Sequence, residues 1–257
     1  LGGSEMYIRD RIDAASLSNG EQGMLSSRAG LVARIGGALN NHDGNVSAQG
    51  DLQLAVGSLD NSTGRLHGQS GIHLDLNRGH WNNQGGLVTA PGPLQLDNLA
   101  SVDNRGGEIS SARGFEVRGD QLDNRGGTLK SEGSLGLTAA TGLDNRAGQV
   151  LGGDLRLDVG PLDNQNGRVQ ASNELRLTAG SVDNRDGVLA SGAQLTLQAG
   201  TVDNRFGKLS SSTGLTATLA GNLLNQSGLF TAGGDLQLSS ADLINQHGEL
   251  AAGGTLQ

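Results

Sequence analysis

The sequence has 257 residues, including 44 glycines, one Trp, one Tyr, three Phe and no cysteine, and its formal net charge is −8. A compact core of this size normally relies on aromatic side chains for buried area, so the composition favours a narrow, repetitive cross-section. The acidic balance, without a cluster of Lys or Arg, argues against a nucleic-acid partner. No apolar run of 18 residues is present, which argues against membrane insertion.

Along the chain, residues 1–16 are predicted to be an irregular lead-in or partial coil, and residues 17–257 a single repeat domain within a longer chain. The repeat is anchored by the motif Asn-x-x-Gly, and successive anchors are separated by 19 to 22 residues. Gly20 is predicted to occupy the Asn position of a first, degenerate copy. The remaining anchors are Asn41, Asn61, Asn83, Asn104, Asn124, Asn145, Asn164, Asn184, Asn204, Asn225 and Asn245. This length corresponds to one coil of a β-solenoid of about 20 residues.

Apolar residues recur at fixed offsets from each anchor: two before it, then five, eleven and thirteen after it. For the anchor Asn184 these positions hold Val182, Leu189, Leu195 and Leu197. Even separations place side chains on one face of a strand, and glycines between the runs are expected to supply positive φ angles at bends. We therefore predict an all-β fold, a right-handed parallel β-helix of about twelve coils forming a rod about 55–60 Å long.

The recurrent Asn is predicted to be structural. An Asn at a bend tolerates the left-handed region, and its amide both donates and accepts, so identical residues one coil apart can bond along the stack as a ladder. Such a ladder satisfies polar groups that are costly to bury. We assign this role to all eleven anchor residues.

An acidic residue precedes many of the anchors, and two interpretations of this column are open. Aligned carboxylates invite calcium, but the calcium-binding nonapeptide of β-rolls is absent. An Arg follows two residues after several of the Asp residues, so a solvated ladder of alternating charge explains the column more simply. The acidic residues are Asp60, Asp103, Asp123, Asp144, Asp163, Asp183 and Asp203, and the basic ones are Arg105, Arg125, Arg146, Arg185 and Arg205.

The coil that begins at Asn61 departs from the pattern. It has 22 residues, and the next coil carries Pro91 and Pro93 at its second corner. Because irregular coils often bear surface features of solenoids, we predict a contact patch for a cell-surface receptor or glycan, formed by His67, His73, His80 and Trp81. The histidine spacings match no zinc motif, and no metal site or cofactor is predicted.

A polysaccharide-acting enzyme is the other alternative, since such enzymes use β-helices. Their chemistry needs convergent carboxylates in a cleft built by long loops. The narrow range of anchor spacings leaves no inserted loop, so no catalytic residue is predicted and the chain is not expected to be an enzyme.

The repeat unit, as in 182–200 (VDNRDGVLASGAQLTLQAG) and 162–180 (LDNQNGRVQASNELRLTAG), resembles the filamentous haemagglutinin repeat. That family builds the shafts of two-partner secretion exoproteins, including contact-dependent growth inhibition toxins of Gram-negative bacteria. The resemblance covers residues 17–257. It implies a secreted, cell-surface rod with structural and adhesive roles, which presents a distal effector or receptor-binding module.

The resemblance also implies a partner for export. An outer-membrane two-partner secretion transporter would act through regions outside this chain. In that family an amino-terminal domain directs secretion and a variable carboxy-terminal domain can be a toxin. Neither is evident in the sequence, so we expect this segment to carry no secretion signal or toxin activity of its own.

Overall fold

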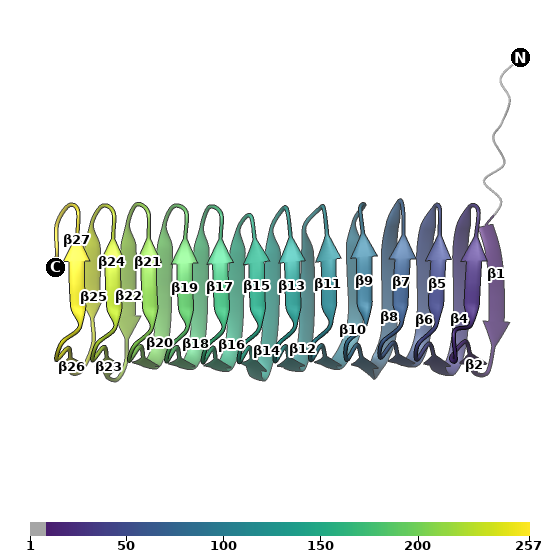
Figure 1. The fold of residues 1–257 in the computed structure, drawn as a ribbon, viewed down its shortest axis with the longest axis horizontal. Helices are drawn as coiled ribbons and strands as arrows, with labels where there is room; N and C mark the ends of the chain where they lie inside the picture. Colours follow the sequence, from purple (N-terminus) through teal and green to yellow (C-terminus); the bar gives the residue numbers. More distant parts are fainter. Residues whose placement is uncertain (1–8) are drawn as a thin grey trace, which may run out of the picture.

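The structure is a computed structural model that describes residues 9–257. These residues form a straight rod of stacked coils, with the strands lying across the rod axis (Figure 1). Two parallel sheets run the length of the rod, a twelve-stranded sheet of short strands and a fifteen-stranded sheet of longer ones. The predicted parallel β-solenoid of about twelve coils is therefore confirmed. Of the predicted lead-in 1–16, residues 1–8 lie outside the described part of the chain.

The short sheet contains one four-residue strand from each coil, and each strand begins four residues after an anchor Asn in the coils from Asn41 onward. Neighbouring strands pair in register; for example, Thr128 pairs with Gln149 and Leu129 with Val150. The strands are β3 (Met24–Ser27), β5 (Asn45–Ala48), β7 (Arg65–Gly68), β9 (Leu87–Ala90), β11 (Glu108–Ser111), β13 (Thr128–Ser131), β15 (Gln149–Gly152), β17 (Arg168–Ala171), β19 (Val188–Ser191), β21 (Lys208–Ser211), β24 (Leu229–Ala232) and β27 (Glu249–Ala252).

The long sheet covers the other side of each coil and bends midway, where several pairs shift register. Its first strand pairs in register with β4, so residues 9–14 already extend the rod. The strands are β1 (Arg9–Ala14), β2 (Leu17–Ser18), β4 (Gly30–Asn40), β6 (Asp51–Asp60), β8 (Gly71–Asn82), β10 (Leu94–Asp103), β12 (Phe115–Asp123), β14 (Leu135–Asp144), β16 (Leu155–Asp163), β18 (Leu175–Asp183), β20 (Leu195–Asp203), β22 (Leu215–Leu219), β23 (Leu223–Leu224), β25 (Leu236–Ser239) and β26 (Leu243–Ile244).

The core lies between the two sheets and consists of one layer of aliphatic side chains per coil. The predicted inward positions are confirmed: Val182, Leu189, Leu195 and Leu197 are each at most 2% exposed. Each side chain stacks on its equivalent one coil away, because the strands are parallel and in register. Leucine and valine fill this narrow interior without the large aromatic area that a globular core would use.

The tight turn after each anchor Asn has a different construction from the predicted one. In every coil from Asn41 to Asn245, the left-handed residue is the second after the Asn, with φ between 53° and 62°. Neither the Asn nor the following glycine is left-handed. A Cβ on Gly127 would lie 2.1 Å from the carbonyl oxygen of Asn104 in the preceding coil, so this glycine is needed for close approach between coils. The expectation that it supplies a positive φ was wrong; among the predicted corner glycines, Gly142 does so, with φ 132°.

The first turn also differs from the prediction. Asn19, rather than Gly20, occupies the anchor position, because its Nδ2 donates to Oδ1 of Asn41 at 2.8 Å and to the carbonyl of Gly23 at 3.2 Å. This turn contains one more residue than the others, and two of its residues, Glu21 and Gln22, are left-handed. The three-residue spacing used to search for anchors could not find it.

Candidate functional site

The anchor asparagines form one column inside the rod. In each coil the side-chain Nδ2 donates to Oδ1 of the Asn in the next coil, as from Asn124 to Asn145 at 2.7 Å. The same Nδ2 lies within hydrogen-bonding distance of the glycine carbonyl of its own turn and of a short-strand carbonyl in the next coil. The asparagines from Asn41 to Asn225 are at most 1% exposed. Their amides are thus fully engaged in packing one turn on the next, and a contribution to stability stays a prediction.

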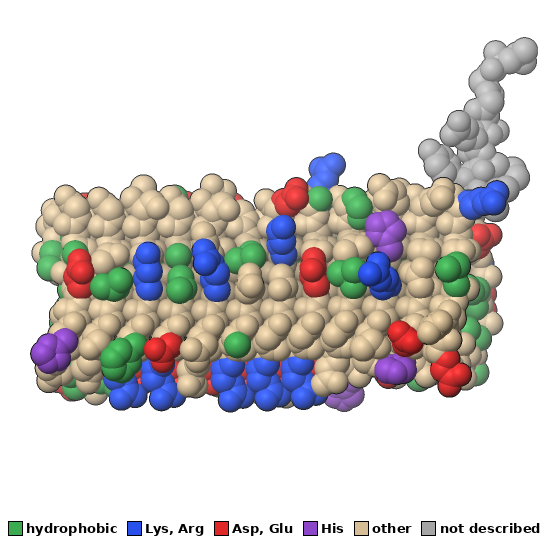
Figure 2. Space-filling model, viewed as in Figure 1, with side chains coloured by type: hydrophobic (Ala, Val, Ile, Leu, Met, Phe, Trp, Pro, Cys, Tyr) green, Lys and Arg blue, Asp and Glu red, His purple; other side chains and the backbone are tan. Residues whose placement is uncertain are grey.

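Outside this column, Asp and Arg side chains form a surface stripe along the turns, the Arg–Asp stripe. Arg146 donates from Nη2 to Oδ2 of Asp144 at 2.6 Å, and its Nε lies 3.5 Å from Oδ2 of Asp163 in the next coil. Figure 2 shows the basic members as a row of blue side chains along the lower edge. The stripe joins Asp103, Asp123, Asp144, Asp163, Asp183 and Asp203 to Arg105, Arg125, Arg146, Arg185 and Arg205.

The stripe perturbs the acidity of its members. Partial burial acts to raise the pKa of Asp144, but hydrogen bonds from the side chain and backbone of Arg146, with the charges of Arg146 and Arg125, outweigh it. The pKa of Asp144 therefore lies below its ordinary value, and the pKa values of Asp103 and Asp203 are lowered by the same balance. The hydrogen bond to Asp144 in turn raises the pKa of Arg146. These results confirm the alternating-charge interpretation of the acidic column.

The four residues of the predicted contact patch do not lie together on the surface. Trp81 is 1% exposed and packs in the core between Leu59 and Val102 of the neighbouring coils, so its assignment to a surface patch was wrong. The physical reason is its position two residues before an anchor, which points inward in every coil. Its indole Nε1 has no hydrogen-bond partner among residues 9–257.

The three histidines remain accessible but are divided between the two sheets. His67 is in β7 of the short sheet, and its Nδ1 lies 2.9 Å from Oγ1 of Thr89. In the long sheet, His73 and His80 lie in β8, where His73 Nε2 is 2.8 Å from Oδ2 of Asp97. Each ring bonds to the next coil along the rod. The structure therefore presents single histidines and not a cluster.

The two extra residues of this coil form a bulge in β8. Asn77 and Arg78 are both left-handed, with φ 46° and 64°. Asp75 closes the bulge: its Oδ1 accepts hydrogen bonds from Nδ2 of Asn98 and from the backbone N–H of Asn77, each at 3.0 Å. These bonds, led by that from Asn98, lower the pKa of Asp75.

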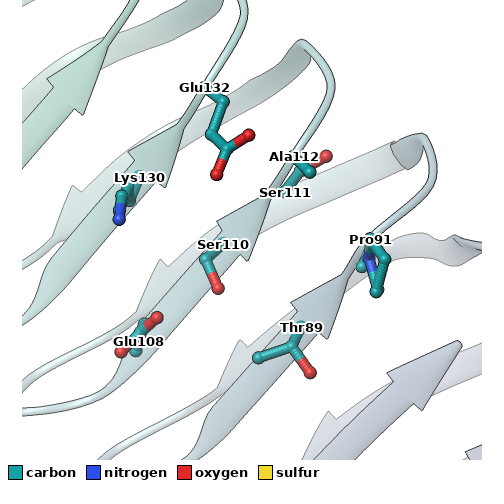
Figure 3. Close-up of a pocket in the computed structure, with 9 residues that line it drawn as sticks. Thr89, Pro91, Glu108, Ser110, Ser111, Ala112, Lys130 and Glu132 are labelled. Atoms are coloured by element: carbon teal, nitrogen blue, oxygen red, sulfur yellow. The ribbon is translucent and has the colours of Figure 1, made fainter. Parts of the chain in front are cut away.

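Three hollows, which the sequence did not predict, lie on the outer face of the short sheet. The first, of about 260 Å³, lies over β9, β11 and β13, where Ser110 and Ala112 are smaller than the residues around them (Figure 3). The side chains of Glu108, Lys130 and Glu132 line it. Larger hollows of about 630 and 610 Å³ lie on either side of it along the rod. A signal in the sequence was the run of small residues at these outward positions.

Searches for other kinds of site gave two results within residues 9–257. No group of three or more His, Asp or Glu side chains is arranged to hold a metal ion. In the same part of the chain, no helix has the length and apolar character needed to cross a membrane.

Comparison with known proteins connects this geometry to a family. The family model described as the haemagglutinin repeat matches residues 9–75, 55–178, 150–227 and 218–257, which together span the described chain. The chain is also similar to the 16S rRNA endonuclease CdiA of Enterobacter cloacae subsp. cloacae, with 35% identity over 69 residues. These residues are 27% of this chain and only 2% of that protein. No solved structure matches the chain.

Proposed function

The chain belongs to the haemagglutinin repeat family, and from this we propose that it is a segment of the shaft of a large secreted exoprotein on a Gram-negative cell surface. The shaft holds a distal effector or receptor-binding module away from the membrane. Export through an outer-membrane two-partner secretion transporter is part of the proposal, and the regions that engage that transporter are outside this chain.

The observation that carries the proposal is the unbroken register of the coils. Adjacent strands pair in parallel from β3 to β27 in the short sheet and from β1 to β25 in the long sheet. Each coil contacts its neighbours through the core, the Asn column and the Arg–Asp stripe, so the rod behaves as a stack of nearest-neighbour interfaces. Such a stack transmits the position of one end to the other, as a spacer must.

We assign no enzymatic role to this segment. The relative's name includes an endonuclease activity, but the match covers 69 residues of a far longer protein. The acidic side chains nearest to each other here, those of the Arg–Asp stripe, are engaged by arginine and by the backbone of the turn. They are therefore accounted for by stacking of the coils.

A deletion of whole coils tests the shaft. Removing residues 125–204 joins one anchor turn to another and deletes four coils, which shortens the rod by about 19 Å at the inter-strand spacing. We expect small-angle scattering of the purified chain to show this shortening, and the full exoprotein to be exported with an active distal module. Removing residues 125–134, half a coil, is the control and disrupts the register. A distal module inactivated by the four-coil deletion, in a rod that still folds, would contradict the spacer role.

A second candidate function is a receptor contact at the irregular coil. The bulge at Asn77 and Arg78 favours it, since strained backbone is often kept at functional sites. Replacement of His67, His73 and His80 by Ala tests the histidines without disturbing Trp81. Lost cell binding at unchanged stability supports this candidate, and unchanged binding supports a passive shaft.

A further inference from the structure

The three hollows of the short sheet form one trough parallel to the rod axis. The third residue of each short strand from β3 to β17 lines one bank, and the first residue after each strand lines the other. The first and third hollows share Lys130 and Glu132. The first and second are joined by the contact between His67 and Thr89, which are paired in register. The trough therefore crosses eight consecutive coils.

The banks present hydroxyl, amide and imidazole groups at regular intervals. Ser26, Ser47, His67, Thr89 and Ser110 follow one another on the first bank, one per coil. Figure 2 shows most of this face in tan, the colour of uncharged polar side chains and backbone, with a few charged groups between them. The surface is thus rich in groups that can donate to and accept from a hydroxylated ligand.

The charges in the central hollow are free to take part. Lys130, Glu108 and Glu132 line it from neighbouring strands, and none of them makes an ion pair within residues 9–257 (Figure 3). The arginines of the Arg–Asp stripe, by contrast, are all paired with carboxylates. Across the whole trough Arg28, Lys130 and Arg168 are balanced almost completely by the two glutamates. A near-neutral lining favours an uncharged ligand over a polyanion.

The period of the trough limits the shape of the ligand. Eight coils at the inter-strand spacing give a length of about 34 Å with one set of polar groups every ~4.8 Å. That spacing is close to the length of one sugar unit in an extended hexose chain. An extended peptide is a poorer fit, because peptides add to sheet edges through main-chain bonds, and the backbone groups under this face are already paired within the sheet.

We propose that the trough binds a linear, uncharged polysaccharide that lies parallel to the rod axis, with the hollow at Ser110 as its centre. Carboxylates of Glu108 and Glu132 accept hydrogen bonds from sugar hydroxyls, and Lys130 donates to them. The proposal is independent of the shaft: it concerns the side of the rod, and a rod that binds no sugar still acts as a spacer.

The test compares two nearly identical strands. Ser110 in β11 (sequence EISS) and Ser210 in β21 (KLSS) have the same outward position and similar burial, but only Ser110 lies in the trough. We expect calorimetry to detect binding of at least one of cellohexaose, N-acetylchitohexaose and maltohexaose to the purified chain, with the matching disaccharide bound more weakly. Ser110→Phe is expected to weaken this binding by about tenfold or more, and Ser210→Phe to leave it unchanged.

Three outcomes would overturn the proposal: no binding of any of the three hexasaccharides, an equal loss in both Phe variants, or binding of a heparin hexasaccharide alone. Thermal melting of both variants checks that the fold is retained. If Ser110→Phe fails to fold, the exposed pair Lys130→Gln and Glu132→Gln provides the second test, with Lys208→Gln as its control. The shaft stands or falls by the separate deletion experiment.

Discussion

Asn124 donates a hydrogen bond from its side-chain Nδ2 to Oδ1 of Asn145 at 2.7 Å, and both side chains are fully buried. The backbone N–H of Asn124 also donates to the carbonyl of Asp144, at 2.7 Å. One residue therefore connects two coils through both its side chain and its main chain. Because a buried amide cannot exchange these partners for water, its removal affects the coil on each side.

Replacement of Asn145 by Ala is expected to destabilise the rod by about 2–4 kcal/mol, since it leaves a donor on Asn124 and an acceptor on Asn164 unsatisfied. Urea unfolding followed by the fluorescence of Trp81, which is buried, measures this change. Asn173→Ala is the control, because Asn173 is exposed, and it is expected to change stability by less than about 0.5 kcal/mol. Equal effects of the two variants would show that the Asn column does not stabilise the fold.

Two adjacent glycines are expected to respond differently to alanine. Gly126 has φ 62° with open space where its Cβ would be, so Gly126→Ala should cost about 1 kcal/mol of backbone strain. At Gly127 the added Cβ would lie 2.1 Å from Asn104 O and 2.8 Å from Asn124 Oδ1. Gly127→Ala should therefore cost about 3 kcal/mol or more. Thermal and urea unfolding of the pair would contradict this explanation if Gly126→Ala proved the more damaging change.

The fold could be predicted from the sequence because its determinants are local and repeated. The offsets of Leu and Val from each Asn specify a strand face, and the narrow range of anchor spacings requires that one coil stack on the next. Asn124 and Gly127 were both recognised as turn residues. Their separate reasons, a ladder and a close approach, depend on atoms one coil away that the sequence pattern does not show.

Trp81 shows where composition misled the prediction. Its offset from Asn83 is the inward one, as with Val182 and Asn184, and the core pattern alone would have buried it. Its rarity, and the histidines near it, suggested a surface patch. The pattern of offsets was the better guide, because every coil must fill the same interior.

The trough was not predicted, since a hollow is defined by the relative sizes of side chains in successive coils. Ser110 and Ala112 are unremarkable within their own coil. They form a depression only because Glu132 lies one coil further along and Pro91 one coil before. Reading the outward columns across coils, as the inward ones were read, would have revealed it.

Phe206 is expected to be replaceable with a gain in stability. It has φ 58° and is 66% exposed, so a bulky side chain has a left-handed backbone and little burial to compensate for it. Asn166 occupies the same position in another coil with φ 53°. Phe206→Asn should stabilise the rod by about 0.5–1 kcal/mol, and Asn166→Phe should destabilise it by a similar amount. Paired thermal melts measure both; a loss of stability in Phe206→Asn would show that Phe206 packs usefully against its neighbours.

Acid is expected to weaken the rod through the Arg–Asp stripe. The folded-state pKa values of Asp103, Asp144 and Asp203 lie below the unfolded value of about 3.9. The unfolded chain therefore binds protons first as the pH falls. The stabilisation from these carboxylates is fully present above about pH 4 to 5 and is lost as the pH falls through the lower folded-state pKa values. Urea midpoints measured from pH 7 to pH 2.5 should be nearly level at first and then decline.

The arginines provide the matched control for this pH dependence. Gln165 naturally replaces an Arg in one coil and still donates to Asp163, at 3.1 Å, so Gln preserves the hydrogen bond while removing the charge. Replacement of Arg105, Arg146 and Arg205 by Gln should reduce stability only modestly at pH 7, by less than about 1 kcal/mol for each exposed pair. It should also flatten the decline below pH 4, because the unfavourable cost of protonating Asp144 in the folded state becomes smaller. A decline as steep as that of the unmodified chain would mean that other carboxylates govern acid unfolding.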